Sequence, residues 1–250
     1  MTAGSALSPG AVTPRPDRFA LATVIEHTFL PAVLGPRSVV LDLGGSSAGF
    51  AQAVHAMCGC ACHVVEAAPQ KFAAIAETPS IRKYHYAVCG ADGPVTFAVA
   101  TDATQCDSIA PVGGSASRQT VTVPGISLPT LVERLGLAAI DLLKVDIEGA
   151  EIAMFDATPD DLLRRIGQIT VEFHDFEDPG QAPAVRRILS RLAGLGFAVV
   201  VMTHRFHGDV LLLNRERLGI TVAQLLYFRS AVKYGRGVGR ILARIAGRPE

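Results

Sequence analysis

Apolar runs of strand length alternate with helical segments along most of the chain, and this alternation constrains the fold more than any other feature of the sequence. The runs cover Ser38–Leu43, His63–Glu66, Tyr84–Cys89, Ile140–Val145 and Ile169–Phe173. Strands that alternate with helices form βαβ units, in which a parallel sheet is covered by helices on both faces. We therefore expect an α/β fold.

The last two apolar runs, Phe197–Met202 and Val210–Asn214, depart from this alternation. Only His204–Asp209 separates them, whereas a parallel return needs a crossover of about a dozen residues. The two runs should therefore form an antiparallel hairpin. The polar, Gly-rich segment 95–125 also departs from the pattern, and we interpret it as an insertion beside the sheet.

Both ends of the chain differ from the central domain, which we place at residues 37–217. Residues 1–17 are rich in Ser, Pro and Gly and lack a signal-peptide pattern, so we expect a flexible leader. The apolar spacing over residues 18–36 predicts an amphipathic helix that caps the domain. Residues 218–250 form a basic tail, with six Lys or Arg and one Glu in the last 22 residues.

The basic tail has three readings. A solvated tail is favoured, because glycines within it weaken a helix. A helix on an anionic membrane surface is the main alternative, since cations would line one face and aliphatic side chains the other. A protein or nucleic-acid partner is a third reading, although we expect no nucleic acid.

Composition places the protein in the cytoplasm, with peripheral membrane contact through the tail as a variant of that expectation. No apolar run approaches the roughly 18 residues of a membrane-spanning helix. Five cysteines are an odd number in a chain long enough to fold without disulfides. The run CGCACH lacks the paired spacing of zinc sites, so we interpret its cysteines as small buried residues and expect no structural metal.

Two strands end in acids. The run LLKVDIEGAE carries Asp146, Glu148 and Glu151, and the run ITVEFHDF brings Glu172 and His174 after the next strand. Open α/β sheets bind ligands at the carboxyl ends of their strands, so these side chains should share one site. A histidine there titrates near neutral pH and can act as a general base.

A glycine turn follows the first strand. The run VVLDLGGSSAGF contains Asp42, Gly44, Gly45 and Gly49, and such glycines let the backbone approach a ligand closely. Glu66 follows about 20 residues later, where an acid of a nucleotide-binding unit accepts hydrogen bonds from ribose. The spacing is not G-x-G-x-x-G, which disfavours an NAD site.

In this order and spacing, LDLGGSSAGF, VVEAAPQKF, SLPTLVERLGLAAIDLLKVDIEGAE and ITVEFHDF resemble the FkbM family of S-adenosylmethionine-dependent methyltransferases. The similarity covers residues 38–175. It implies a Rossmann-like class I methyltransferase fold, with a seven-stranded, mostly parallel sheet and a C-terminal antiparallel hairpin. The family turn resembles D-V-G-A-N-x-G, whereas Ser46, Ser47 and Ala48 lengthen it here by one residue.

The resemblance also implies residue roles. The glycine turn would hold the methionine part of the cofactor, Glu66 its ribose, and Asp146 would lie by the transferable methyl group. The expected cofactor contacts are Asp42, Gly44, Gly45, Ser46, Gly49, Glu66, Ala67 and Asp146.

We expect methyl transfer to a hydroxyl group of a sugar, glycolipid or polyketide-type metabolite. Such a hydroxyl reacts once a base takes its proton, and His174 is the first choice for that base, with Asp146 second. The expected substrate contacts are Glu148, Glu172, His204 and His207.

Three alternatives stay open. A divalent ion held by Asp146, Glu172 and His174 could acidify the hydroxyl instead, although a metal is not favoured. The chain could also be an NAD(P)-dependent oxidoreductase, or a non-catalytic nucleotide-binding module.

Overall fold

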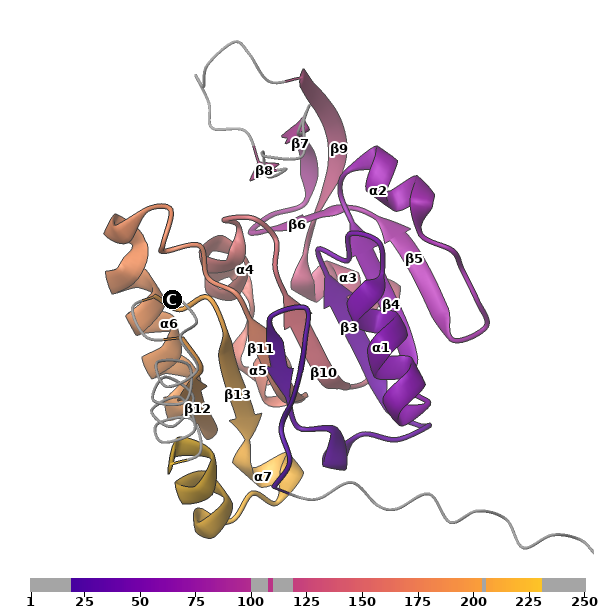
Figure 1. Cartoon of the computed structure of the whole chain (residues 1–250). Coiled ribbons are helices and arrows are strands. Elements are labelled where there is room, and N and C mark those ends of the chain that lie inside the picture. The colour runs from indigo at the N-terminus through magenta and orange to yellow at the C-terminus, as the bar shows by residue number, and fades with distance from the viewer. Residues whose placement is uncertain (1–18, 100–107, 110–118, 204–205, 231–250) are drawn as a thin grey trace, which may run out of the picture.

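The computed structural model describes residues 19–99, 108–109, 119–203 and 206–230. Its centre is a seven-stranded sheet in which β13 is antiparallel to both of its neighbours and the other pairs are parallel. The α/β class and the C-terminal hairpin are therefore confirmed. In order across the sheet (Figure 1), the strands are β12 (Phe197–Val201), β13 (Val210–Asn214), β11 (Ile166–Val171), β10 (Ile140–Val145), β3 (Val39–Leu43), β4 (Ala61–Glu66) and β5 (Ile81–His85).

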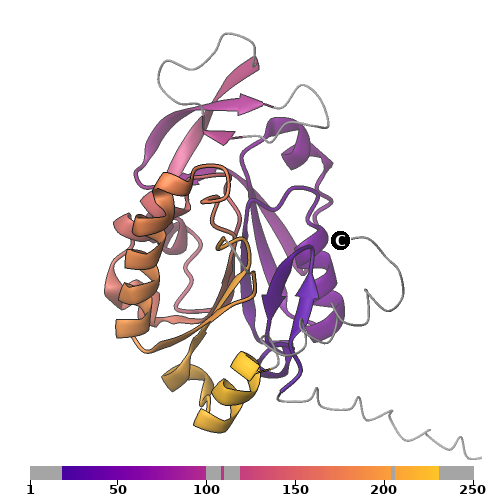
Figure 2. The same cartoon turned by 60° about the vertical axis from the view of Figure 1, so that its left-hand side comes forward.

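Apolar side chains project from both faces of the sheet into the core, as the apolar runs predict. In β10, Leu143 joins the core on one face and Leu142 the core on the other. Figure 2 shows α6 on one side of the sheet and α1 on the other. The first face packs against α3 (Leu128–Arg134), α4 (Glu151–Ala157), α5 (Asp160–Arg164) and α6 (Ala182–Gly194), and the second against α1 (Gly49–Cys58). The short helix α2 (Pro69–Ala74) joins β4 to β5.

The N-terminal segment is not the predicted helix. Residues 18–36 instead contain a two-stranded antiparallel hairpin, β1 (Ala22–Val24) and β2 (His27–Phe29), followed by the 3-10 turn η1 (Pro31–Val33). The hairpin covers the same face of the sheet as α1 (Figure 2). The predicted segment does pack on the sheet, but it is a β-hairpin, so the predicted helix is wrong.

Polar side chains of the sheet explain why this segment is extended. The Gln168 side chain accepts a hydrogen bond from Leu30 N at 2.8 Å and donates one to Leu30 O at 3.2 Å. Asp209 accepts from the Thr28 hydroxyl at 2.6 Å and from Thr28 N at 3.2 Å. A helix would bond these backbone groups internally, so the sheet side chains favour the strand over the local helical pattern.

The domain extends beyond its predicted end at residue 217. After α7 (Arg215–Leu218), residues 222–230 are helical. Ile220 and Phe228 are buried against Leu30 and Ala198, so they belong to the core. The predicted tail boundary at 218 is therefore wrong, and residues 231–250 of the basic tail lie outside the described residues.

The predicted insertion forms a second sheet beside the first. Its strand order is β6-β9-β7-β8, with β6 (Ala87–Cys89), β7 (Gly93–Val99), β8 (Ser108–Ile109) and β9 (Gln119–Ser127). This sheet is drawn above the main sheet in Figure 1. Within the described ranges, the helices are too short or too polar to cross a bilayer.

Replacing Gln168 by Leu should destabilise the protein by about 1–3 kcal/mol, because the buried N–H and C=O of Leu30 lose their partners. Urea unfolding measures the difference. The exposed Gln52→Leu on α1 is the matched control and should change stability by less than about 0.5 kcal/mol. Equal stability of Gln168→Leu and wild type would show that the amide does not hold the N-terminal segment.

Candidate active site

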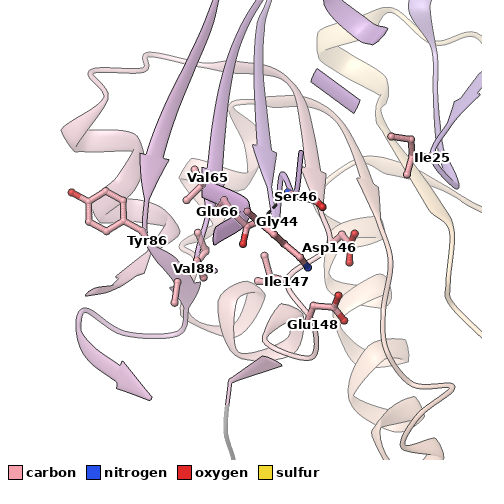
Figure 3. A pocket seen from close by; sticks show the side chains of 13 residues that line it. Ile25, Gly44, Ser46, Val65, Glu66, Tyr86, Val88, Asp146, Ile147 and Glu148 are labelled. Carbon is pink, nitrogen blue, oxygen red and sulfur yellow. Dashed lines mark hydrogen bonds between the residues drawn. The ribbon is translucent and has the colours of Figure 1, made fainter. Parts of the chain in front are cut away.

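A pocket of about 240 Å³ opens at the carboxyl edge of β3, β4 and β10 (Figure 3). The turn after β3 contributes Gly44 and Ser46, and the end of β4 contributes Glu66 and Ala67. The loop after β10 contributes Asp146, Ile147 and Glu148, and Tyr86, Ala87 and Val88 also line the pocket. In Figure 3, Tyr86 lies on the side away from Asp146. Five of the eight predicted cofactor contacts thus line one pocket: Gly44, Ser46, Glu66, Ala67 and Asp146.

The glycines bring the turn against the neighbouring strands. Gly44 has φ +73°, and a Cβ on it would lie 1.6 Å from the backbone oxygen of Asp146. A Cβ on Gly45 would lie 2.0 Å from a methyl carbon of Val64. Neither position tolerates a side chain, so both glycines are needed for the turn itself. Gly45 and Gly49 shape the turn without lining the pocket.

Glu66 ties the glycine turn to the end of β4. Its carboxylate accepts hydrogen bonds from Ser46 N and Ala68 N, each at 2.7 Å. Burial raises the pKa of Glu66, while the two N–H donors oppose that rise. A carboxylate oxygen can accept more than one hydrogen bond, so Glu66 retains acceptor capacity toward the pocket.

Lys144 lies beneath the site and was missed in the sequence. Its ammonium donates to Leu43 O at 3.2 Å and to Gly44 O at 2.6 Å. It also lies 3.3 Å from Asp42 Oδ1 and 3.4 Å from Asp146 Oδ2. Burial alone would lower the pKa of Lys144, but the two carboxylates outweigh it and the pKa is raised.

Asp42 and Asp146 therefore have different positions around one ammonium group. Asp42 is fully buried and does not line the pocket, so the structure places it below the predicted cofactor contacts. Asp146 is partly exposed and faces the pocket. Burial would raise the pKa of Asp146, but His27 and Lys144 hold it well below its usual range.

His174 lies among carboxylates. Its Nδ1 is 3.1 Å from Glu151 and its Nε2 is 3.2 Å from Glu148 and 3.9 Å from Asp146. Burial lowers the pKa of His174, but the carboxylates of Glu148 and Glu151 outweigh it and raise the pKa to about 11. In this arrangement the ring keeps its proton at neutral pH, so it cannot accept another from a hydroxyl.

Glu151 organises the loop that carries Glu148. One oxygen of its buried carboxylate accepts hydrogen bonds from Ile147 N and Gly149 N, both at 3.1 Å. Glu148 has φ +53°, an uncommon value for a residue with a side chain. Glu151 therefore holds both the loop and the ring of His174.

Glu172 has a pKa raised into the neutral range. Burial and the charge of Asp146 raise the pKa of Glu172 to about 7, although the charge of His174 opposes the rise. Its carboxylate shares a triad with His27 and Asp146, in which the candidate ligand atoms lie within 4.8 Å of one another. A second triad joins Asp146, Glu148 and His174.

These triads bear on the metal alternative. The predicted ligand set of Asp146, Glu172 and His174 is divided between them, with Asp146 in common. Lys144 already places a positive charge 3.4 Å from Asp146. The ammonium group of Lys144 therefore already balances the charge of Asp146, and it would compete with a divalent metal ion for that carboxylate.

Of the two histidines predicted to contact substrate from the loop between β12 and β13, the structure describes one. His204 lies outside the described residues. His207 is held by Asp175, which accepts from the ring Nδ1 at 2.7 Å and from His207 N at 3.0 Å. Phe176 and Phe206, the sequence neighbours of Asp175 and His207, have ring centroids 6.4 Å apart.

Two residues of the site were missed for different reasons. Lys144 is a single charge inside an apolar strand, and a buried charge requires partners. That signal was present in the sequence. His27 reaches Asp146 only because residues 27–29 form a strand, so it depended on a prediction that was wrong.

A doubly covered α/β sheet with a glycine turn and an acidic strand end at its carboxyl edge is a Rossmann-like fold with its pocket where such folds bind ligands. Residues 39–199 match the family model for the methyltransferase FkbM domain. The chain belongs to the FkbM family of S-adenosylmethionine-dependent methyltransferases. The alternative of an NAD(P)-dependent oxidoreductase is therefore wrong. No curated protein sequence matches the chain.

Solved structures resemble the chain at low identity. The precorrin-6y C5,15-methyltransferase of Geobacter metallireducens is 14% identical, with 72% of this chain and 79% of that chain covered and a TM-score of 0.40. Fibrillarin of Aeropyrum pernix, solved with natively bound S-adenosyl-L-methionine, is 14% identical over 76% and 69%, with a TM-score of 0.38. The Methanococcus jannaschii fibrillarin pre-rRNA processing protein is 13% identical over 78% and 70%, with a TM-score of 0.41.

Replacing Lys144 by Met should cost about 3–5 kcal/mol of stability at pH 7, because it leaves the buried Asp42 carboxylate without its counter-charge. Chemical denaturation measures the loss. The exposed Arg186→Met should change stability by less than about 0.5 kcal/mol. Adding Asp42→Asn to Lys144→Met should recover part of the loss, and a double variant no more stable than the single one would contradict the ion-pair account.

Proposed function

We propose that the protein transfers the methyl group of S-adenosylmethionine to a hydroxyl oxygen of a sugar, glycolipid or polyketide-type metabolite. The observation that supports this most is the half-buried carboxyl group of Glu172, which has a pKa of about 7 and lies in one cluster with Asp146, a residue that lines the pocket. A carboxylate that titrates near neutral pH is suited to take a proton from a hydroxyl. Methyl transfer to carbon would not need a hydroxyl proton to be removed.

The residues that line the pocket support a placement of the cofactor in it. Glu66 would bind the ribose hydroxyls, and the turn of Gly44 and Ser46 would face the methionine part. Ala67 and Val88 would flank the base, which suits an apolar ring. Asp146 would lie toward the sulfonium, where a carboxylate with a depressed pKa keeps its negative charge.

The proton acceptor in this proposal is Glu172 and no longer His174. Both nitrogens of His174 face carboxylates, so its ring supplies positive charge and orients Glu148. Glu172 is half-buried and has a pKa raised to about 7, so an appreciable fraction is ionised at neutral pH. The bound cofactor supplies the electrophilic methyl carbon, and the protein aligns the hydroxyl oxygen with it.

Glu148 and His207 are the proposed contacts of the acceptor. Glu148 is partly exposed at the pocket. Asp175 holds the Nδ1 of His207, so the other ring nitrogen is left for a hydrogen bond to the acceptor in this proposal. This arrangement supports recognition of a polar acceptor with several hydroxyl groups. Substitution of either residue should raise KM for the acceptor more than for the cofactor.

The direct test supplies S-adenosylmethionine labelled on its methyl group together with panels of sugar, glycolipid and polyketide acceptors. Label should enter an ether that resists mild base, with one equivalent of S-adenosylhomocysteine formed. Cofactor binding without transfer to any acceptor would favour the non-catalytic module. Absence of cofactor binding to folded protein would end the methyltransferase proposal.

Glu172→Gln should lower kcat/KM by about 10²- to 10⁴-fold, because a general base is lost. In the wild type, kcat/KM should rise with pH through about 7, since Glu172 acts in its ionised form. That rise should vanish in the variant, while affinity for S-adenosylhomocysteine is retained. The exposed Glu216→Gln should leave rate and pH profile unchanged. A full rate with the same pH profile in Glu172→Gln would remove Glu172 from the reaction.

A further inference from the structure

At the tip of the β1–β2 hairpin, Ile25 has a backbone conformation that is unfavourable for isoleucine. Val24 pairs with His27, so Ile25 and Glu26 form a two-residue loop. Their φ angles are +45° and +63°, which is the pattern of a type I′ turn. Such turns favour Asn-Gly, and a β-branched residue at positive φ is an outlier.

Ile25 is also unfavourably placed with respect to solvent. Its relative exposure is 64%, among the highest of the large apolar residues in the described chain. Neither the backbone nor water therefore favours isoleucine at this position. A residue that is costly in both respects is expected where its side chain has a function in the bound state.

The side chain of Ile25 lies at the pocket. It lines the same cavity as Gly44, Glu66 and Asp146. Figure 3 shows it on the side of Ser46 and Asp146, away from Tyr86. A Cβ placed on Gly49 would lie 2.8 Å from the Cδ1 of Ile25, so the side chain reaches the first residue of α1.

The hairpin holds this tip firmly in place. The ring of His27 packs edge-on against Phe50 of α1, with centroids 5.8 Å apart. Thr28 is bonded to Asp209, and the Thr23 and Thr28 hydroxyls lie 2.9 Å apart. These anchors fix both strands next to the turn, so the position of Ile25 is built into the apo fold.

We propose that Ile25 is a cofactor-contacting residue, whose side chain packs on the methionine side of bound S-adenosylmethionine and closes the pocket there. The inference rests on the cofactor placement proposed above. Packing on the ligand would remove an exposed aliphatic side chain from water, which favours binding. It also explains why isoleucine stands in a turn that prefers asparagine.

The first test is calorimetric titration of the full chain with S-adenosylhomocysteine. Ile25→Ala should weaken binding by about tenfold, because most of the apolar contact is lost. Leu226→Ala is the matched control, since Leu226 is equally exposed at 63% and does not line the pocket. The control should bind as the wild type does. Binding by Ile25→Ala equal to that of the wild type would overturn the proposal.

A double variant separates a role in binding from a role in folding. Ile25→Asn with Glu26→Gly installs the favoured type I′ pair, so the melting temperature of the apo protein should rise. Affinity for S-adenosylhomocysteine should nevertheless fall as it does in Ile25→Ala. A purely structural role of Ile25 predicts retained affinity in this stabilised variant, and that result would also overturn the proposal.

The two proposals fail in different ways. If the folded wild type does not bind S-adenosylhomocysteine, the cofactor placement itself is wrong and the inference falls with it. If the wild type binds and the Ile25 variants bind equally well, only the inference on Ile25 is wrong. Lower melting temperature together with weaker binding in both Ile25 variants would likewise contradict it, because the effect would then be on folding.

Discussion

The buried ammonium of Lys144 holds the centre of the site together. It bonds the carbonyl oxygens of Leu43 and Gly44 and lies between the carboxylates of Asp42 and Asp146. These contacts join the ends of β3 and β10, the two neighbouring strands after which Gly44, Ser46 and Asp146 line the pocket. The glycine turn can then lie against Asp146 without a side chain between them. Without this cation, the buried carboxylate of Asp42 would lose its counter-charge beside a second carboxylate, Asp146, at the edge of the pocket, which would destabilise both strand ends.

The same electrostatic arrangement separates the roles of the acids. Asp146 lies near positive groups and stays ionised, whereas burial and the charge of Asp146 outweigh the charge of His174 at Glu172 and raise its pKa to about 7. The carboxylates of Glu148 and Glu151 balance the positive charge of His174, so its ring keeps its proton. Pairs of titratable groups whose surroundings move their pKa values apart are a mark of acid and base function. In the proposed reaction, the proton of the acceptor hydroxyl would therefore pass to Glu172.

The central sheet and the pocket edge could be predicted because their signals are local. The strands Ile140–Val145 and Val210–Asn214 were predicted to the residue, since apolar runs end there at polar residues. The N-terminal hairpin could not be predicted in the same way. Its partners Gln168 and Asp209 lie 138 and 181 residues away from Leu30 and Thr28, and such contacts leave no local pattern. The proximity of Glu148 and Glu151 to His174 was expected, but the protonated state of the ring depends on contacts of 3.1–3.2 Å that the sequence does not give.

The central claim is that the cofactor lies along the carboxyl edge between the glycine turn and Asp146, with Glu172 beyond the methyl group. A crystal structure of the protein with S-adenosylhomocysteine tests this claim most directly. The account predicts ribose hydroxyls on Glu66, the sulfur atom facing Asp146, and Lys144 still between Asp42 and Asp146. An adenosine group bound elsewhere, or a sulfur atom directed away from Asp146 and Glu172, would contradict it.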